Sequence, residues 1–117
     1  MEGIWHRPAH YHVARVGARH FPFIDPEAQG RFLALRNLLD AQDLAEATRW
    51  VEEGRVTLGD GTPVSWQPAH VILPVSERLR AYFASAAYRD AAEQARARYQ
   101  GAGLQLRIPP PPLPPSP

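Results

Sequence analysis

The sequence predicts a single α+β domain, and three observations support this class. The chain has 117 residues, a length that suits one domain with a modest buried core. Short alternating runs with β-branched and aromatic residues predict strands, and longer segments with apolar residues at helical spacing predict helices. The predicted order is a strand, a pair of helices, further strands and a long helix, followed by a tail of different composition.

The first predicted strand covers residues 9–16. Tyr11, Val13 and Val16 give this segment an alternating pattern of apolar residues. The segment after this strand is expected to form a loop that runs to Ile24.

Two helices are predicted next, and each begins at an acidic capping residue. Asp25, followed by Pro26 and Glu27, supplies an N-cap acceptor, a proline suited to the first helical position and a charge that the helix dipole favours. Asp43 caps a shorter second helix, which ends at Gly54. The first of these helices carries an apolar stripe, expected to face the core, made of Phe32, Leu35, Leu38 and Leu39.

The second half of the chain predicts short strands and one long C-terminal helix. Residues 55–58 and 64–66 flank a turn-rich link and predict a hairpin. A further strand is predicted over residues 70–75, and Ser76 then caps a helix over residues 77–100. The clearest apolar contacts expected on this helix are Leu79, Tyr82, Phe83 and Ala86.

The predicted organisation is an N-terminal arm over residues 1–8, an α+β domain over residues 9–100 and an extended Pro-rich tail over residues 101–117. The proline run of the tail cannot form helix or sheet ladders, so it predicts polyproline II structure. Such a tail is either a solvated end or a ligand for an aromatic groove on a partner. Its candidate contact residues are Pro110, Pro111 and Leu113.

The first 24 residues mix cations, imidazoles and aromatic rings, with Glu2 as the only acid. A segment of this kind is a candidate for binding phosphate and stacking on bases. Trp5 precedes every predicted element and is the best candidate for a contact outside the domain, with nucleic acid or with protein. The residues predicted to bind nucleic acid are Arg7, His10, Tyr11, His12, Arg15 and Arg19.

Two histidines stand at alternate positions of the predicted first strand, so the imidazoles of His10 and His12 would point the same way. They are either a metal-binding pair or part of a solvated face. The chain has no cysteine, which excludes disulfides, thiolate zinc sites and cysteine nucleophiles. Any metal site would therefore need histidine and carboxylate ligands.

Charge and hydropathy restrict the function classes only broadly. The net charge of +1 permits a nucleic-acid partner without requiring one. No apolar run is long enough to cross a bilayer, and the first residues lack the apolar core of a signal peptide. We therefore expect a cytoplasmic protein with no membrane partner.

Residues in two parts of the chain carry a family resemblance: Tyr11-His12-Val13, Arg15, Gly17, Phe23-Ile24-Asp25 and Arg31-Phe32-Leu33-Ala34-Leu35 in the first, and Gln67-Pro68-Ala69-His70-Val71-Ile72-Leu73 in the second. Together they resemble the single-tyrosine HUH transposases, particularly the REP-associated branch, over residues 7–75. The second part looks like the family's Pro-x-His-hydrophobic-His strand, except that Ile72 stands in place of a second metal-binding histidine.

The resemblance implies a ferredoxin-like sandwich that recognises single-stranded or hairpin DNA. It also implies a divalent metal, Mg or Mn, that polarises the scissile phosphate, and a tyrosine that attacks it. By this resemblance His70 is the remaining metal ligand, and Tyr88 and Tyr99 are the candidate nucleophiles. Without the second histidine, the resemblance implies a shortened, inactive relative that needs no cofactor and binds nucleic acid without cutting it.

A noncatalytic small subunit of a larger protein assembly is the alternative. The N-terminal arm and the Pro-rich tail would then be its contacts, because both can follow a partner's surface without secondary structure of their own. The sequence leaves both functions open, and it leaves the oligomeric state open as well.

Overall fold

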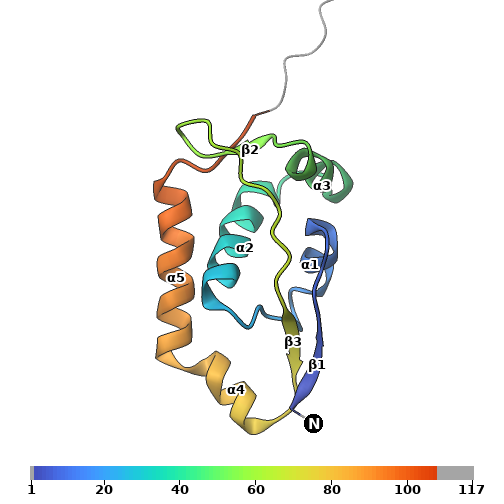
Figure 1. Ribbon diagram of the computed structural model, residues 1–117, viewed down its shortest axis with the longest axis vertical. Helices are drawn as coiled ribbons and strands as arrows, with labels where there is room; N and C mark the ends of the chain where they lie inside the picture. The colour runs from blue at the N-terminus through green and yellow to red at the C-terminus, as the bar shows by residue number, and fades with distance from the viewer. Residues whose placement is uncertain (1, 108–117) are drawn as a thin grey trace, which may run out of the picture.

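The structure is a computed structural model, and it describes residues 2–107 (Figure 1). Within these residues the chain forms five helices and two small antiparallel sheets, so the predicted α+β class is confirmed. In chain order the elements are β1 (Gly3–His6), α1 (Tyr11–Gly17), α2 (Pro26–Leu39), α3 (Leu44–Glu52), β2 (Val56–Thr57), β3 (Val71–Pro74), α4 (Glu77–Ala84), α5 (Ala86–Gly101) and β4 (Gln105–Leu106).

Helix α2 lies between α5 and the β1–β3 pair (Figure 1), and it begins as the sequence predicts. The carboxylate of Asp25 accepts a hydrogen bond from the backbone N–H of Glu27 at 3.0 Å, and Pro26 is the first helical residue. The predicted apolar stripe faces the core, because Phe32, Leu35 and Leu39 are buried and Leu38 packs partly buried against them.

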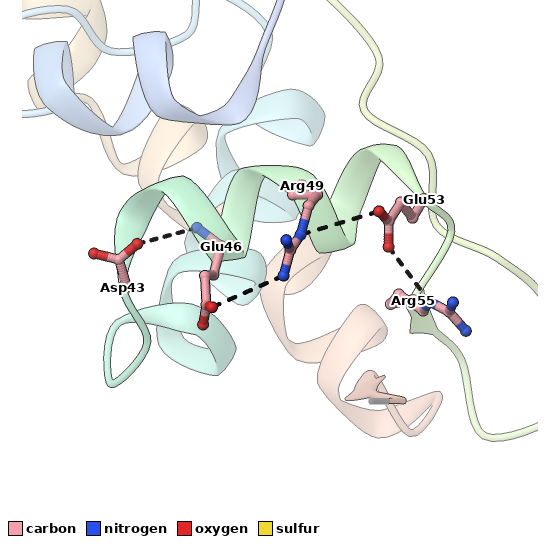
Figure 2. A network of polar contacts seen from close by, with 5 residues as sticks. All are labelled: Asp43, Glu46, Arg49, Glu53 and Arg55. Atoms are coloured by element: carbon pink, nitrogen blue, oxygen red, sulfur yellow. Dashed lines mark hydrogen bonds and ion pairs between the residues drawn. The ribbon is translucent and has the colours of Figure 1, made fainter. Parts of the chain in front are cut away.

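Helix α3 begins and ends at the residues that the sequence predicts. The carboxylate of Asp43 accepts a hydrogen bond from the backbone N–H of Glu46 at 3.2 Å, and Gly54 follows the helix with a φ of 75° that favours glycine. Arg49 lies 3.8 Å from the Glu46 carboxylate and 4.0 Å from that of Glu53 (Figure 2). These exposed ion pairs neutralise the charges of α3 locally and contribute little to stability.

Helices α2 and α5 run side by side (Figure 1), and small residues set their separation. A Cβ atom at Gly30 would lie 2.3 Å from the carbonyl oxygen of Ala92 and 2.4 Å from the Cβ of Ala95. The two helices therefore approach as closely as they do only because Gly30 has no side chain.

The segment predicted as a strand over residues 9–16 is the helix α1, so this prediction is wrong. The apparent alternation rested on Tyr11, Val13 and Val16, but Val13 and Val16 are exposed. Tyr11 and Ala14, three residues apart, are the buried pair. The core therefore selects a helical spacing in this segment.

The residues assigned to an irregular N-terminal arm contain the strand β1. This strand pairs antiparallel with β3, and the register places Trp5 opposite Ile72 and His6 opposite Val71. The strand predicted over residues 70–75 is therefore confirmed in position, and its partner is the arm.

The predicted hairpin is only partly formed. The backbone N–H of Val64 donates to the carbonyl oxygen of Val56 at 2.8 Å, and an isolated bridge joins Thr57 to Pro63. Strand β2 takes its strand partner from β4, which lies in the segment predicted as a tail. Pro63 has no N–H to donate, and this limits the ladder that a hairpin would need.

The long helix predicted over residues 77–100 is two helices, which meet at Ser85. The Ser85 hydroxyl accepts a hydrogen bond from the backbone N–H of Tyr88 at 3.2 Å and caps α5, while the extended backbone of Ser85 (ψ 148°) interrupts the helix. No residue of α4 is fully buried and Ala86 is exposed, but the expected contacts of Tyr82 and Phe83 are present, because both rings pack edge-on against Tyr88 with centroids 5.1 and 5.0 Å away. The buried residues of α5 are Tyr88, Ala92 and Ala95.

The sheet arrangement does not confirm the ferredoxin-like part of the prediction. A ferredoxin-like sandwich combines four strands in one sheet, whereas the described residues form two separate pairs, β1–β3 and β2–β4. No helix within residues 2–107 has both the length and the apolar character needed to cross a membrane.

Candidate functional site

Large apolar side chains are exposed on the outer face of the sheet that contains β1 and β3. Strand β3 has a partner on both edges, because a short extended segment pairs with it on the edge opposite β1. The N–H of Ile24 donates to the carbonyl oxygen of His70 at 3.0 Å, and the N–H of Ile72 donates to that of Pro22 at 3.1 Å. Three chain segments therefore lie side by side beneath this face.

Side chains from all three segments meet on the outer face. Trp5, Ile24, His70 and Ile72 line a pocket of about 260 Å³ whose walls are almost entirely apolar. The Trp5 ring packs edge-on against the His70 imidazole with ring centroids 4.9 Å apart. Despite this contact the Trp5 side chain is 62% exposed, so most of its apolar surface is available to a partner.

A second pocket, of about 510 Å³, continues the first, because Ile24 and His70 line both. Tyr82 lies in this second pocket, and its hydroxyl donates to the carbonyl oxygen of Ile24 at 2.7 Å. Burial, together with the nearby charge of Asp25, raises the pKa of Tyr82 and keeps its hydroxyl a donor. The continuous surface is called the Trp5 groove below and consists of Trp5, Ile24, His70, Ile72 and Tyr82.

Tyr11, a predicted nucleic-acid contact, is part of the core. Its side chain is 1% exposed and packs edge-on against Trp66 with ring centroids 6.0 Å apart. Burial is the main cause that raises the pKa of Tyr11 to about 12. A ring enclosed in this way cannot stack on a base, so Tyr11 is removed from the candidate nucleic-acid contacts.

Two further predicted contacts form ion pairs within the chain. His10 Nδ1 lies 2.5 Å from a carboxylate oxygen of Glu52, which connects the start of α1 to α3. Arg15 Nε donates to the Asp40 carboxylate at 3.0 Å, next to the end of α2. These contacts connect α1 to α3 and to the end of α2, and Asp40 partly neutralises the charge of Arg15 before any phosphate approaches.

Arg7, Arg19 and His12 remain on the surface. Within residues 2–107 neither Arg7 nor Arg19 forms an ion pair. The His12 ring stacks nearly parallel on His10, with centroids 5.6 Å apart and planes at 11°. In the described part of the chain no group of three or more histidine or acidic residues is arranged to hold a metal ion.

The two candidate nucleophiles lie in α5 and do not line the Trp5 groove, although the Tyr88 ring packs edge-on against Tyr82 with centroids 5.1 Å apart. Tyr88 is buried and its hydroxyl donates to the carbonyl oxygen of Phe23. Burial raises the pKa of Tyr88 above its ordinary value, so its position suits a core hydrogen-bond donor better than a nucleophile. Tyr99 is half-buried, and its ring centroid lies 5.9 Å from the guanidinium carbon of Arg98.

Of the residues predicted to contact a protein partner, the structure describes only Trp5. Trp5 is exposed as the sequence predicts, whereas the buried Trp50 and the half-buried Trp66 belong to the fold. The indole N–H of Trp66 donates to the carbonyl oxygen of Pro8 at 3.1 Å. The candidate tail contacts Pro110, Pro111 and Leu113 lie outside the described residues.

Sequence reasoning did not assign Ile24, Ile72 and Tyr82 to a binding surface. Ile72 lies in β3, two positions after His70, which immediately precedes the strand, and this alternation is the one sequence signal that places both on the same face. Ile24 and Tyr82 come from a loop and a separate helix, so no local pattern connects them to Trp5.

Comparisons with models of known families, with curated proteins and with solved structures found no match for this chain.

Proposed function

We propose that this chain is a noncatalytic protein-binding module, a small subunit of a larger assembly, and that the Trp5 groove is its contact surface. The observation that carries the proposal is the 62% exposure of Trp5 beside an almost entirely apolar pocket. Burial of such surface contributes about 25 cal/mol per Å², and tryptophan is enriched among residues that dominate binding energy. A partner that covers Trp5 therefore gains affinity from surface that the fold leaves exposed.

The composition of the groove favours an extended, proline-rich ligand. Its two connected pockets run from the Trp5 ring to the Tyr82 ring, with Ile24 and His70 between them. Polyproline II segments dock on aromatic-lined grooves and lose little conformational entropy, because they are extended before they bind. The chain's own Pro-rich tail would provide a second contact by the same chemistry, on a groove of the partner.

Fluorescence anisotropy with a labelled polyproline peptide tests this function on the full chain. We expect saturable binding that weakens by about ten-fold or more for Trp5→Ala, since loss of a central tryptophan typically removes more than 1.4 kcal/mol of binding free energy. Val16→Ala is the matched control, because Val16 is an apolar residue 75% exposed on α1 and outside the groove. Absence of saturable binding, or equal affinities for the native chain and Trp5→Ala, would contradict the proposal.

Nucleic-acid binding is the second candidate function, and the exposed arginines favour it. Arg7 and Arg19 project from the segment that the transposase resemblance marks as basic, and neither has an ionic partner among residues 2–107. Arginines of this kind can contact phosphates and release counterions. Strand cleavage is not part of this candidate function, because Ile72 stands where the resemblance places a second metal-binding histidine and the Tyr88 hydroxyl donates within the core.

Anisotropy with labelled single-stranded, hairpin and duplex DNA at two salt concentrations separates the two functions. Nucleic-acid binding predicts a preference for the hairpin, steep loss of affinity with salt, and loss in an Arg7→Ala and Arg19→Ala double variant. An Arg80→Ala and Arg89→Ala double variant is the control, since both residues are exposed, on α4 and α5, outside the basic first segment. If the two double variants weaken binding equally, the binding is nonspecific charge attraction.

A further inference from the structure

The hydrogen bonds of β3 show in which direction the backbone N–H and C=O groups of its neighbour β1 point. The N–H of Ile72 donates to Pro22, and the carbonyl of His70 accepts from Ile24, so the backbone groups of His70 and Ile72 point away from β1. Successive residues of a strand direct their N–H and C=O groups to opposite edges. The residues of β3 on either side of Ile72 therefore direct theirs towards β1.

This alternation carries over to β1 through the register. Leu73 lies opposite Ile4, so Ile4 directs its N–H and C=O groups towards β3. Gly3 and Trp5 then direct theirs to the other edge. In the described part of the chain no strand pairs with that edge, since the sheet order is β1–β3 alone.

The open edge lacks the features that normally prevent pairing with another chain. Monomeric proteins protect an edge strand with lysine, proline, a bulge or a covering element, and β1 contains neither lysine nor proline. It instead exposes Ile4 (53%) on one face and Trp5 (62%) on the other. A partner strand would cover apolar surface on both faces at once.

We propose that the partner is a second copy of this chain, and that two β1 strands pair antiparallel about a two-fold axis. Two identical strands satisfy this symmetry directly, and the resulting four-stranded sheet has the order β3–β1–β1–β3. This inference goes beyond the proposed function, because it concerns the backbone edge of β1, although Trp5 belongs both to this strand and to the Trp5 groove.

Symmetry restricts the register of the paired strands. Directly opposite residues in an antiparallel pair share a face, and a two-fold axis perpendicular to the sheet leaves both faces in place. A residue can therefore lie opposite itself or opposite a residue an even number of positions away. Within β1 this leaves two central pairs, Ile4 with Ile4 or Trp5 with Trp5.

In the first register every residue that forms a hydrogen bond between the two copies lies within β1. With Ile4 opposite Ile4, the outward-facing backbone groups of Gly3 meet those of Trp5 in the second copy, and all of them lie within β1. The absent side chain of Gly3 leaves room for the indole that lies opposite. The second register would instead require Arg7, outside the strand, as the partner of Gly3.

The cysteine-free sequence makes the register directly testable, because Ile4→Cys introduces the only thiol. In the first register Ile4 forms the non-hydrogen-bonded central pair, whose Cα atoms lie about 4.5 Å apart, within the range that a disulfide spans. Under mild oxidation we expect Ile4→Cys to form a disulfide dimer about ten-fold faster than the exposed control Val16→Cys, because pairing raises the effective thiol concentration. Equal rates, or faster crosslinking of Trp5→Cys than of Ile4→Cys, would overturn the proposed register.

Sedimentation equilibrium on the full native chain tests the dimer without a crosslink. We expect a mass twice the monomer value of 13.1 kDa at about 100 µM protein and a monomer for Ile4→Lys, which places a charge at the centre of the pair. Circular dichroism confirms that the variant is folded. A native chain that remains a monomer overturns the dimer. Polyproline binding by Ile4→Lys is a separate readout of the Trp5 groove, so the two proposals fail independently.

Discussion

The contact between α2 and α5 and the outer face of the β1–β3 sheet use side chains in opposite ways. The helices meet through their smallest residues, Gly30 against Ala92 and Ala95, with no space left between the backbones. The outer face of the sheet leaves the much larger side chain of Trp5 exposed. Close packing of small residues stabilises the folded chain, whereas large exposed residues add little to folding and leave apolar surface that a partner can cover. Substitutions should therefore affect stability in the first region and association in the second.

Gly30→Ala should cause the largest loss of stability among substitutions at the contact between α2 and α5. Its Cβ would overlap the backbone of Ala92, so the two helices must move apart, and overpacking of this kind costs about 2–3 kcal/mol. Urea unfolding followed by circular dichroism measures the change. Gly101→Ala is the control, because a Cβ there meets no atom within 4 Å, and a similar loss in both variants would contradict the close-contact interpretation.

Tyr88→Phe should produce the next largest loss, because α5 also connects to the sheet region through this side chain. The substitution leaves the carbonyl oxygen of Phe23 without its side-chain donor, and an unsatisfied buried acceptor costs about 1.5 kcal/mol. Thermal unfolding compares it with Tyr99→Phe, whose hydroxyl makes no hydrogen bond among the described residues. Equal melting temperatures for the two variants would show that the buried hydrogen bond is not stabilising.

Ser85→Ala tests the joint between the sheet-side helix α4 and the packed helix α5. It removes the hydroxyl that accepts from the backbone N–H of Tyr88, and loss of an N-cap costs about 1 kcal/mol. Unfolding in urea gives the value, with the exposed loop residue Ser65→Ala as control. A Ser85→Ala variant as stable as the control would mean that α4 and α5 join into one helix when the cap is absent.

Trp5→Ala should have the smallest effect on stability, although it removes the largest side chain. Because Trp5 is 62% exposed, the free energy of unfolding should change by less than about 0.5 kcal/mol. Phe32→Ala, at a buried position of α2, should instead cost about 3–5 kcal/mol. A large loss in Trp5→Ala would show that the outer face supports folding and is not reserved for a partner.

Helix starts were predictable because their signals are local. Asp25, Asp43 and Ser76 each accept a hydrogen bond from a backbone N–H two or three residues later, so a short stretch of sequence contains both partners. The cap at Ser85 was not predicted, because a serine inside a continuous helical pattern does not by itself indicate that a new helix begins there.

The strand predictions failed where pairing is distant. Residues 9–16 alternate in hydropathy, yet burial of Tyr11 and Ala14 against the core selects the helix α1. The pairing of β1 with β3 joins residues about seventy positions apart in the chain, and a single sequence carries no signal for such a pair.

For the candidate site, the sequence suggested Trp5 as a contact outside the domain because it precedes the predicted elements, and its side chain is indeed exposed; the contact itself stays a prediction. It could not identify Ile24 or Tyr82, since only the sheet and α4 bring them beside His70. The predicted basic surface was reduced for the same reason, because Asp40 and Glu52 reach Arg15 and His10 from other helices.

By itself the sequence determined the α+β class, the caps that start α2, α3 and α4, and the apolar stripe of α2, because each depends on residues within a few positions of one another. Only the tertiary structure decided that the arm is a strand, that α2 and α5 touch at Gly30 and that the Trp5 groove exists. Those features join segments far apart in the chain, and burial against distant partners overrides local propensity.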